Sequence, residues 1–498
     1  MRRDTRMSAL ESILRRMASE FPDRLVVQCR DRRLSYGQLA GILESLTQNV
    51  GPVAGKRVVL LLPDGIPCYL WHLHLFLAGA VNVPISVQSS SSRIRELCER
   101  VQPHFIVTNT ALRARHRAAL ESFPCITVKP DGIPVPWGFE YEMSGLACGA
   151  GSQNQSASEE KNDIRMIVFT SGSTGTPKGV CLSEGNLLSA AGMMVSFLSL
   201  APPRKSLVTV PLYDYYGFIQ IYGHILGQCG YILGETIGLP DQLFTRIRKE
   251  QVTDLVLVPH TLREILRVMD SDHRDVIAQL QFMTSSSDIL TRDLLEQAFA
   301  LNPALKVVNI YGLTEAGRAC YKVFDRSSME TNCIGIPSPG VEIVLDGPEG
   351  NTGEIILRGP NVMLGYLQHI HDDRVVFSPC TEMRTGDLAY YHNGELILLG
   401  RRDHMINVRG LKIHPVEIET IALRAPDVVD AYAHVSNVSD GEPSICLDVV
   451  LRNGTGDLEQ VRTHMRKNLQ PLFVPRQINI VPSIARTEIG SKIMRAKD

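Results

Sequence analysis

Ten residues of the chain, TSGSTGTPKG from Thr170 to Gly179, concentrate groups that can hold phosphate. They carry five hydroxyl side chains, three glycines and one lysine, and they follow the apolar run IRMIVF. Glycines allow the backbone to approach a ligand closely, while hydroxyl and backbone N–H groups donate hydrogen bonds to phosphate oxygens. A phosphate-bearing ligand is therefore the first candidate for this loop.

Three alternative roles fit the loop less well. A Walker A loop is excluded by spacing, because Pro177 stands where its second glycine is required and Gly179 follows the lysine where serine or threonine is required. An amidase-like serine hydrolase is disfavoured, since the chain has no G-x-S-x-G elbow. The plain alternative is a polar surface loop, which the ordered strand expected before it disfavours.

The loop resembles the phosphate loop of the AMP-forming, adenylate-forming ligases, a superfamily of acyl-CoA synthetases, nonribosomal adenylation domains and luciferases. Further segments match the superfamily's motifs in its order, so the resemblance covers nearly the whole chain. These segments are LSYGQL near residue 35, GAVNVPI at 79, YGLTEAG at 311, IGIPSPGVEI at 334, GEIILRGPNVMLGY at 353, RTGDLAY at 384 and GRRDHMINVRGLKIHPVEIE at 400.

The resemblance implies an enzyme that joins a carboxylic acid to the α-phosphate of ATP, with ATP and Mg²⁺ as cofactors. Because two anions must meet, such a site supplies positive charge and in-line positioning. The residues that the resemblance assigns to the β- and γ-phosphates are Thr170, Ser171, Gly172, Ser173, Thr174, Gly175, Thr176 and Lys178. Those that it assigns to the nucleoside are Asn309, Gly312, Tyr311 for adenine stacking, Asp387 for the ribose hydroxyls, and Arg401.

Two residues predicted for the metal and for the reaction centre, Glu315 and Thr314, belong to a second motif, YGLTEAG. By resemblance, Glu315 with Thr174 holds Mg²⁺, which favours carboxylate, hydroxyl and phosphate oxygens, and Thr314 belongs to the same catalytic motif. The plain alternative for an isolated Glu315 is a solvated helix start.

The C-terminal segment departs from the superfamily pattern T-x-x-G-K-x-x-R. It reads TEIGSKIMR from Thr487, and alignment on KIMR makes Lys492 the catalytic lysine that bridges the acid and the α-phosphate, with Ser491 in the place of glycine. A surface lysine is the alternative. Asp403 matches the hinge of the superfamily's mobile small domain, and Asn407 replaces a lysine common nearby.

The acid pocket is less sharply defined. PLYDYYGF aligns with a stretch that carries FD in amino-acid-activating members, whose carboxylate pairs with the substrate ammonium, and FH in acyl- and aryl-activating members. Asp214 takes this place, so it pairs either with a substrate amine or with Arg318. Arg318 could instead meet a second carboxylate or polar group of the substrate. Ser286 and Ser287 replace glycines and make the pocket wall more polar. The other expected pocket residues are Tyr215, Phe218 and Ser285.

Composition limits the class of protein. Lys and Arg number 51 against 53 Asp and Glu, so no nucleic-acid-binding groove is indicated. The 11 cysteines show no CxxC pair, which predicts reduced thiols in a cytoplasmic protein. The longest apolar stretch, Tyr69 to Ile85, is interrupted by polar residues and proline, so it predicts a buried helix leading into a strand and not a membrane span.

Alternating β-branched runs and helical patterns predict parallel α/β structure. The predicted strands begin near residues 57, 104, 166, 207, 254 and 306, and helices are expected at SSRIRELCERV and QLFTRIRKEQ. From about Asn332 short Gly- and Pro-punctuated segments predict antiparallel strands, and residues 144–163 predict a linker. The expected architecture is a large domain at 1–402, made of two α/β subdomains and a small β-barrel-like one, followed by a mobile α+β domain at 403–498.

These features predict an enzyme that converts a carboxylic acid to its acyl-AMP and passes it to CoA or to the phosphopantetheine of a carrier protein. A small amino acid or other amine-bearing acid is the expected substrate, and the enzyme is expected to be a monomer or homodimer. The rival hypotheses are a fatty- or aryl-acyl-CoA ligase, an amidase-like hydrolase, and a nucleotide-binding protein without catalytic activity.

Overall fold

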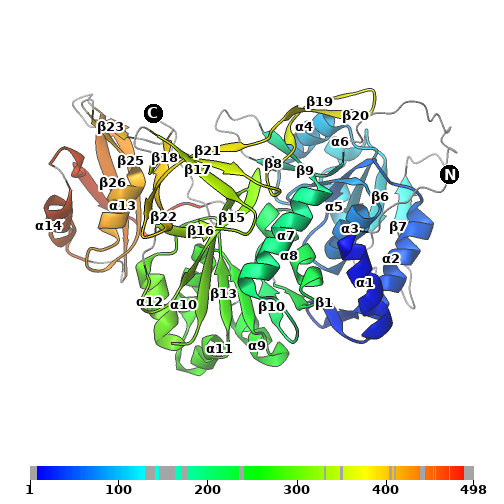
Figure 1. Cartoon of the computed structure of the whole chain (residues 1–498), viewed down its shortest axis with the longest axis horizontal. Helices are drawn as coiled ribbons and strands as arrows, with labels where there is room; N and C mark the ends of the chain where they lie inside the picture. The colour runs from blue at the N-terminus through cyan, green and yellow to red at the C-terminus, as the bar shows by residue number, and fades with distance from the viewer. Residues whose placement is uncertain are drawn as a thin grey trace. The chain divides into compact units, whose positions relative to one another are not determined.

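The structure is a computed structural model that divides into two compact units (Figure 1). The first unit combines Met1–Gly238, Thr314–Gly317 and Pro360–Thr381, and the second combines Leu239–Leu313, Arg318–Gly359 and Glu382–Asp498. The structure describes residues 8–128, 141–144, 163–170, 177–234, 240–329, 332–347, 351–402, 406–408, 411–437, 443–452, 454, 456–469 and 471–486.

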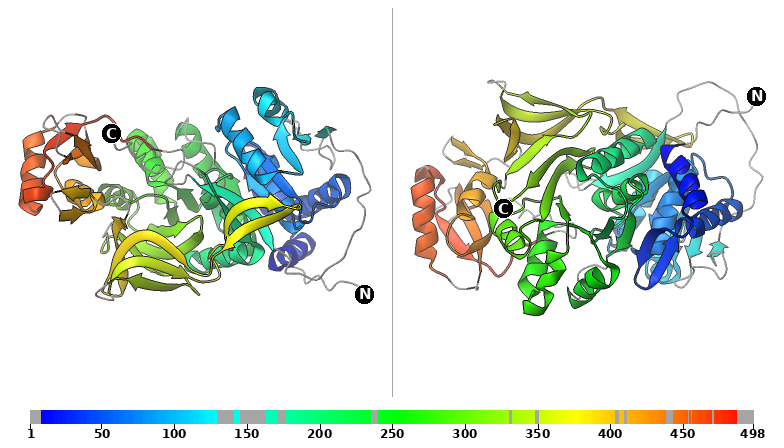
Figure 2. Two further views of the ribbon diagram at one scale, coloured as in Figure 1. Left: turned by 90° about the horizontal axis from the view of Figure 1, so that it is seen from above. Right: turned by 60° about the horizontal axis from the view of Figure 1, so that its bottom comes forward.

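A mixed sheet in the order β20-β19-β9-β8-β4-β3-β5-β6-β7 organises the first unit. Its middle strands β4, β3, β5 and β6 run parallel, and all of their residues except Asn109 are buried, as expected for a sheet covered on both faces. β8, β9, β19 and β20 pair antiparallel, so two hairpins that are far apart in sequence adjoin (Figure 2). The strands are β3 Arg57–Leu61, β4 Val81–Pro84, β5 Phe105–Asn109, β6 Cys125–Val128, β7 Tyr141–Ser144, β8 Ile164–Thr170, β9 Lys178–Ser183, β19 Gly365–His371 and β20 Arg374–Pro379.

Helices of the first unit form where apolar residues recur at helical spacing. α4 buries Ile94, Leu97 and Val101 on one face, and the Ser90 side chain caps its first turn by accepting from the Arg93 N–H. A second strand set in this unit has the order β10-β11-β1-β2. The helices are α1 Ala9–Glu20, α2 Tyr36–Val50, α3 Ile66–Leu77, α4 Ser91–Val101, α5 Thr110–Arg115, α6 Arg117–Leu120, α7 Glu184–Leu198 and α8 Tyr215–Leu226. The strands are β1 Leu25–Cys29, β2 Arg32–Ser35, β10 Lys205–Val208 and β11 Gly230–Leu233.

The second unit begins with parallel strands and continues with antiparallel ones, in the order β17-β18-β21-β22-β16-β15-β14-β13-β12. The strands are β12 Asp254–Leu257, β13 Phe282–Ser285, β14 Lys306–Leu313, β15 Ala316–Phe324, β16 Cys333–Pro337, β17 Glu342–Asp346, β18 Thr352–Arg358, β21 Met383–His392 and β22 Glu395–Arg401. The helices are α9 Pro240–Glu250, α10 Pro259–Val268, α11 Arg274–Ala278 and α12 Arg292–Leu301, with a 3₁₀ turn at Ser271–His273.

The C-terminal part of the second unit has its own apolar core. α13 and α14 cover a sheet in the order β25-β26-β27, and residues such as Ile418, Leu447 and Met465 are fully buried between them. The elements are β23 Ile406–Val408, β24 Leu411–Ile413, α13 Pro415–Ala422, β25 Val428–Asn437, β26 Pro443–Leu451, α14 Leu458–Asn468, a 3₁₀ turn at Pro471–Phe473 and β27 Gln477–Ile480.

The structure confirms the predicted elements. Each expected strand and both expected helices form, α3 leads into β4 as a buried helix, and the strands after Asn332 are antiparallel. The predicted boundary at 402/403 stays a prediction, and residues 145–162 of the expected linker lie outside the described residues. No helix in the described part of the chain is long and apolar enough to cross a bilayer.

Candidate active site

The phosphate-loop motif connects two antiparallel strands. β8 ends at Thr170 and β9 begins at Lys178, and these two residues are register partners. A Walker A loop connects a strand to a helix, so the hairpin topology argues against that motif independently of its spacing. Residues 171–176 lie outside the described residues, so the roles predicted for Ser171 to Thr176 stay predictions.

Tyr366 contacts two predicted site residues of the first unit: Lys178, predicted to bind phosphate, and Glu315, predicted to bind Mg²⁺. Its hydroxyl donates to the Glu315 Oε1 atom at 2.8 Å, and the Lys178 ammonium lies 5.3 Å from the centre of its ring. Tyr366 reaches this place because β19 pairs with β9, opposite Val180. The contact holds a cation and a carboxylate near the end of the loop motif.

Tyr366 was not among the predicted site residues. It is the last residue of GEIILRGPNVMLGY, a segment recognised only as a family motif. The position of an aromatic residue with a hydroxyl at the end of that motif was the available signal.

Glu315 lies in a tight turn between β14 and β15 and not at a helix start. The Met363 N–H donates to the Glu315 carbonyl oxygen at 2.8 Å, and the buried Asn361 amide donates to the Gly317 carbonyl at 2.8 Å. Gly317 itself lies against Tyr215, because a Cβ atom at this position would come within 2.1 Å of the Tyr215 ring. The turn is thus held from two sides.

The carboxylate of Glu315 fits a magnesium site of the family's kind. Mg²⁺ in nucleotide enzymes is usually held by one or two carboxylates together with phosphate and water oxygens. Within the described ranges no group of three or more His, Cys, Asp or Glu side chains forms an all-protein metal site. Thr174, the second predicted ligand, lies outside those ranges.

Three predicted nucleoside residues of the second unit come together: Tyr311 near the end of β14, Asp387 in the middle of β21 and Arg401 at the end of β22. The Tyr311 hydroxyl donates to Asp387 Oδ2 at 2.6 Å, and Arg401 Nη1 lies 3.5 Å from Asp387 Oδ1. Burial, and then the negative charge of Asp387, raise the pKa of Tyr311 well above its usual value, so the phenol stays neutral and donates. The Asp387 N–H donates to Thr385 Oγ1 at 3.0 Å, which fixes the strand at this point.

A second group of polar atoms lies at the carboxyl ends of the parallel strands β13 and β14. Ser285 and Asn309 are register partners, both are buried, and Ser285 Oγ and Asn309 Oδ1 hydrogen-bond to none of the described residues. Ser286, in contrast, donates to the Ile310 carbonyl at 2.8 Å. Ligands of open α/β sheets bind at this edge, so buried atoms without partners are suited to a polar ligand such as a nucleotide base.

Asp214 has a structural role in addition to the one predicted from its motif. It is the N-cap of α8, and its Oδ1 accepts from the Tyr216 N–H at 2.9 Å. Tyr215 packs edge-on against Phe218 at 5.3 Å, and Phe218 is fully buried and stacks on His72. Tyr215, Phe218 and His72 therefore form one packed aromatic cluster next to the N-cap residue Asp214.

Arg318 follows the Glu315 turn directly in β15. It is 3% exposed and adopts φ 61°, a left-handed conformation that costs a non-glycine residue roughly 1–2 kcal/mol. Ser287 also has a left-handed φ of 78°, and Gly312 continues β14 beside Tyr311. A buried guanidinium in unfavourable backbone geometry is typical of a functional position.

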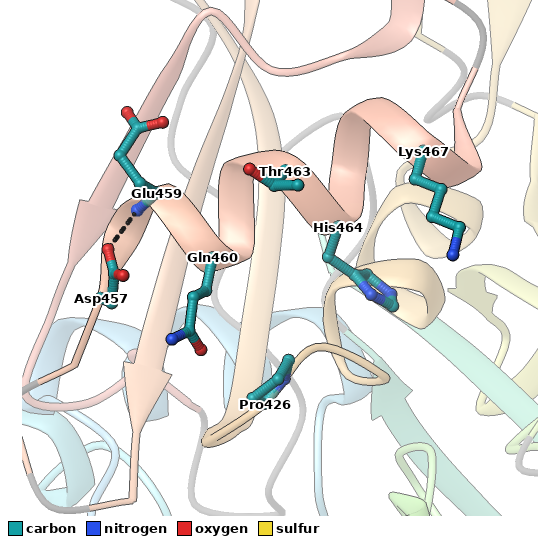
Figure 3. Close-up of a pocket in the computed structure, with 7 residues that line it drawn as sticks. All are labelled: Pro426, Asp457, Glu459, Gln460, Thr463, His464 and Lys467. Carbon is teal, nitrogen blue, oxygen red and sulfur yellow. Dashed lines mark hydrogen bonds between the residues drawn. The ribbon is translucent and has the colours of Figure 1, made fainter.

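A shallow hollow on the C-terminal part of the second unit is separate from the predicted site residues (Figure 3). It is lined by Pro426, Asp457, Glu459, Gln460, Thr463, His464 and Lys467. The Asp457 side chain caps α14 there by accepting from the Glu459 N–H at 2.9 Å. Its lining includes no predicted site residue, and Asp403 and Lys492 lie outside the described residues.

Comparison with known families agrees with this geometry. Residues 14–367 match the AMP-binding enzyme family, and residues 417–491 match the AMP-binding enzyme C-terminal domain. The chain belongs to the AMP-binding enzyme family. It is therefore an AMP-forming acid–thiol ligase with ATP and Mg²⁺ as cofactors.

Relatives of this AMP-binding enzyme cover it almost end to end. The acyl-CoA synthetase ALT10 of Alternaria alternata is 26% identical and aligns over 93% of this chain and 92% of its own. The sulfoacetate–CoA ligase of Cupriavidus necator is 26% identical over 98% and 97%, respectively. The ATP-bound structure of MatB from Rhodopseudomonas palustris is 22% identical and has the same fold, with a TM-score of 0.79 over 96% of both chains.

Proposed function

We propose that this enzyme activates a small polar carboxylic acid and transfers it to a thiol. In the first step an acid carboxylate oxygen bonds to the α-phosphorus of ATP, and pyrophosphate leaves with the electrons of the α–β bond. In the second step a thiolate attacks the acyl carbon and AMP leaves. The observation that carries the proposal is the Lys178–Tyr366–Glu315 cluster beside the β8–β9 hairpin.

Lys178 and Glu315 act on the phosphate end of the nucleotide in this proposal. Lys178 supplies positive charge to the β- and γ-phosphates, and the Tyr366 hydroxyl keeps the Glu315 carboxylate in one orientation. Mg²⁺, when bound at Glu315, would neutralise phosphate charge as a Lewis acid. Tyr366 thereby lowers the reorganisation that phosphate binding requires.

Asp387 and Asn309 act on the nucleoside end. The Asp387 carboxylate, oriented by Tyr311 and Arg401, accepts from the ribose hydroxyls, while Asn309 Oδ1 accepts from an adenine N–H group. Both side chains are buried, which strengthens such hydrogen bonds.

The C-terminal segment completes the first step in our proposal. Residues 403–498 form a mobile domain that pivots about Asp403 and delivers Lys492 to the acid and the α-phosphate. Lys492→Ala should lower acid-dependent adenylation at least about 100-fold, since one positioned charge is worth about 3 kcal/mol in such sites. Lys497→Ala is the control, because the alternative of a surface lysine predicts equal behaviour of the two variants.

Two residues bear on the identity of the acid. Arg318 is buried, and a guanidinium can donate two parallel hydrogen bonds to an anionic group, which supports an acid with a second anionic group. The sulfoacetate–CoA ligase is a relative whose named substrate has such a group. Asp214, the N-cap residue of α8, supports an amine-bearing acid such as a small amino acid, because its carboxylate could pair with the substrate amine. These are the two candidate substrate classes.

Pyrophosphate exchange into ATP, measured with a panel of acids, distinguishes the classes. The panel should contain glycine, β-alanine, sulfoacetate, malonate, benzoate and octanoate. We expect exchange with the small polar acids and little with benzoate or octanoate, and a preference for the last two would contradict the proposed class.

Asp214→Asn makes the test specific. Asparagine caps a helix about as well as aspartate, so the substitution removes the charge and keeps the acceptor for the Tyr216 N–H. If an amine is bound, this variant should lose exchange with amino acids about tenfold or more and keep it with diacids. Arg318→Gln should show the opposite pattern.

The thiol acceptor is tested separately. CoA and a phosphopantetheinylated carrier protein are both candidates, and each is added to enzyme that has formed acyl-AMP. Stimulated release of AMP identifies the acceptor.

A further inference from the structure

Arg100, in the last turn of α4, contacts strand β8 and the residue that precedes strand β9. Its Nη1 atom donates to the Pro177 carbonyl, which directly precedes β9, and its guanidinium carbon lies 5.6 Å from the centre of the Phe169 ring on β8. Phe169 is the register partner of Gly179. One side chain thus connects the two flanks of the phosphate-loop motif.

The position of Arg100 is fixed by the packing of α4. Ile94, Leu97 and Val101 are buried in the core of the first unit. Arg57, whose side chain is 4% exposed, donates from Nε to the Val101 carbonyl at 2.7 Å. The end of α4 is therefore a rigid support for the guanidinium.

The same end of α4 is connected to the hairpin that carries Tyr366. Arg57 Nη2 pairs with Asp373 Oδ1 at 2.6 Å, and Asp373 lies in the turn between β19 and β20. His104 contacts the second carboxylate oxygen of Asp373 at 3.1 Å. The two hairpins that supply Lys178 and Tyr366 are consequently held to one helix end.

We propose that Arg100 is a positioning residue for phosphate binding. It holds the Pro177 carbonyl and the Phe169 ring in fixed relation, so these two flanking groups need little reorganisation when phosphate binds. Its positive charge also lies beside the phosphate-loop motif, which binds the triphosphate in the proposed function. The inference rests on the proposed function only for the identity of the ligand, MgATP.

Substitutions of Arg100 test this role in the full-length enzyme. Arg100→Ala should raise the dissociation constant of MgATP and the KM for ATP about tenfold. The KM for the acid should change less than about twofold, because Arg100 contacts no predicted acid residue. Arg100→Lys should give a dissociation constant and a KM for ATP between those of the wild type and of Arg100→Ala. Lysine keeps the charge but lacks the planar group that can donate a hydrogen bond and stack on a ring at the same time.

Arg95→Ala is the matched control. Arg95 lies on the exposed side of the same helix and donates to the Ala118 carbonyl, away from the hairpin. Its replacement should change the dissociation constant of MgATP less than about twofold from the wild-type value. The melting temperatures of Arg95→Ala and Arg100→Ala should be similar.

Two results would overturn the inference. One is unchanged MgATP affinity in Arg100→Ala, and the other is an equal rise in both KM values together with a lower melting temperature than the control. Direct MgATP binding, followed by calorimetry, separates this test from the proposed function. If the wild-type enzyme binds MgATP but exchanges pyrophosphate with no acid, the proposed function fails while the role of Arg100 is still measured.

Discussion

Asp387 is a carboxylate whose orientation is set before any ligand arrives. Tyr311 donates to one of its oxygens at 2.6 Å, Arg401 lies 3.5 Å from the other, and its main-chain N–H donates to Thr385. An acceptor held in this way needs little reorganisation when it meets a pair of hydroxyls. The charge of Asp387 and its geometry should therefore contribute separately to nucleotide binding.

Substitutions at Asp387 and Tyr311 separate these contributions. Asp387→Asn should raise the KM for ATP about 10- to 100-fold, because hydrogen bonds to a charged group are worth about 1.5–3 kcal/mol. Tyr311→Phe keeps the ring and removes only the orienting hydroxyl, so the expected rise is about three- to tenfold. Steady-state kinetics at saturating acid measures both, and equal effects of the two variants would contradict the separation. Asp346→Asn, in an exposed ion pair with Arg384, is the control.

His74 should make stability depend on pH. The side chain is 2% exposed on α3, and burial lowers its pKa to about 4. The unfolded chain binds a proton below about pH 6.5 and the folded chain does not, so stability is full above that pH and is lost as the pH falls toward 4. At pH 5 the loss due to His74 is about 2 kcal/mol.

Urea denaturation at pH 7.5 and pH 5 checks this expectation. His74→Leu should recover the part of the loss at pH 5 that is due to His74, whereas the part due to His72, whose pKa burial lowers to about 3, should remain. His371→Ala, at an exposed position, should behave like the wild-type enzyme. An unchanged pH dependence in His74→Leu would show that other groups cause it.

At the scale of elements, the turn between β14 and β15 connects the start of α8 to Glu315, the proposed magnesium ligand. Tyr215 at the start of α8 packs on Gly317, and Gly317 is two residues after Glu315. The packing leaves no space for a side chain. A displacement of α8 therefore transmits directly to the Glu315 turn.

Gly317→Ala tests this coupling. The new methyl group would lie 2.1–2.3 Å from three atoms of the Tyr215 side chain, so the turn or the ring must shift, at a cost of about 1–3 kcal/mol. We expect adenylation to fall more than tenfold. Gly192→Ala in α7 is the matched control, because nothing lies within 4 Å of its added Cβ and helix propensity favours alanine. Full activity in Gly317→Ala would refute the coupling.

Elements were predictable where local pattern decides them. The buried parallel strands are β-branched runs in the sequence. Asp214 precedes an apolar helical segment, which is an N-cap signal, although its motif had been interpreted only as pairing with a substrate amine or with Arg318. The motifs located Lys178 and Glu315 without the structure. Tyr366 was not predictable from local pattern, because its role arises from the pairing of β19 with β9 across more than 180 residues of sequence.

At the scale of the molecule, a buried ion-pair cluster connects the C-terminal segment of the second unit to α10 and to the segment that follows β13. Asp430 on β25 accepts from Arg486 at 2.8 Å and pairs with Arg263 of α10 at 3.4 Å, and Arg486 also contacts Asp288. Burial, and then the charge of Arg263, lower the pKa of Arg486 to about 10. No sequence motif predicted this cluster, because its members come from four separate segments.

Asp430→Ala should destabilise the second unit strongly. It leaves Arg263 and Arg486 close together and lacking their shared carboxylate, and loss of one member of a buried ion pair costs about 3–5 kcal/mol. The measurement is the shift of the urea midpoint. Glu459→Ala, which removes an exposed pair with Arg462, should change stability by less than about 0.5 kcal/mol. Similar small shifts in both variants would contradict the importance of the cluster.

The central claim is that the whole chain forms an acyl-AMP. Its most direct test is product analysis by ³¹P NMR after incubation with ATP, Mg²⁺ and an acid that supports exchange. Without a thiol acceptor, the proposed activity gives acyl-AMP and pyrophosphate in equal amounts, formed only when acid is present, with no ADP. Formation of ADP and phosphate, or of AMP at the same rate without acid, would contradict it.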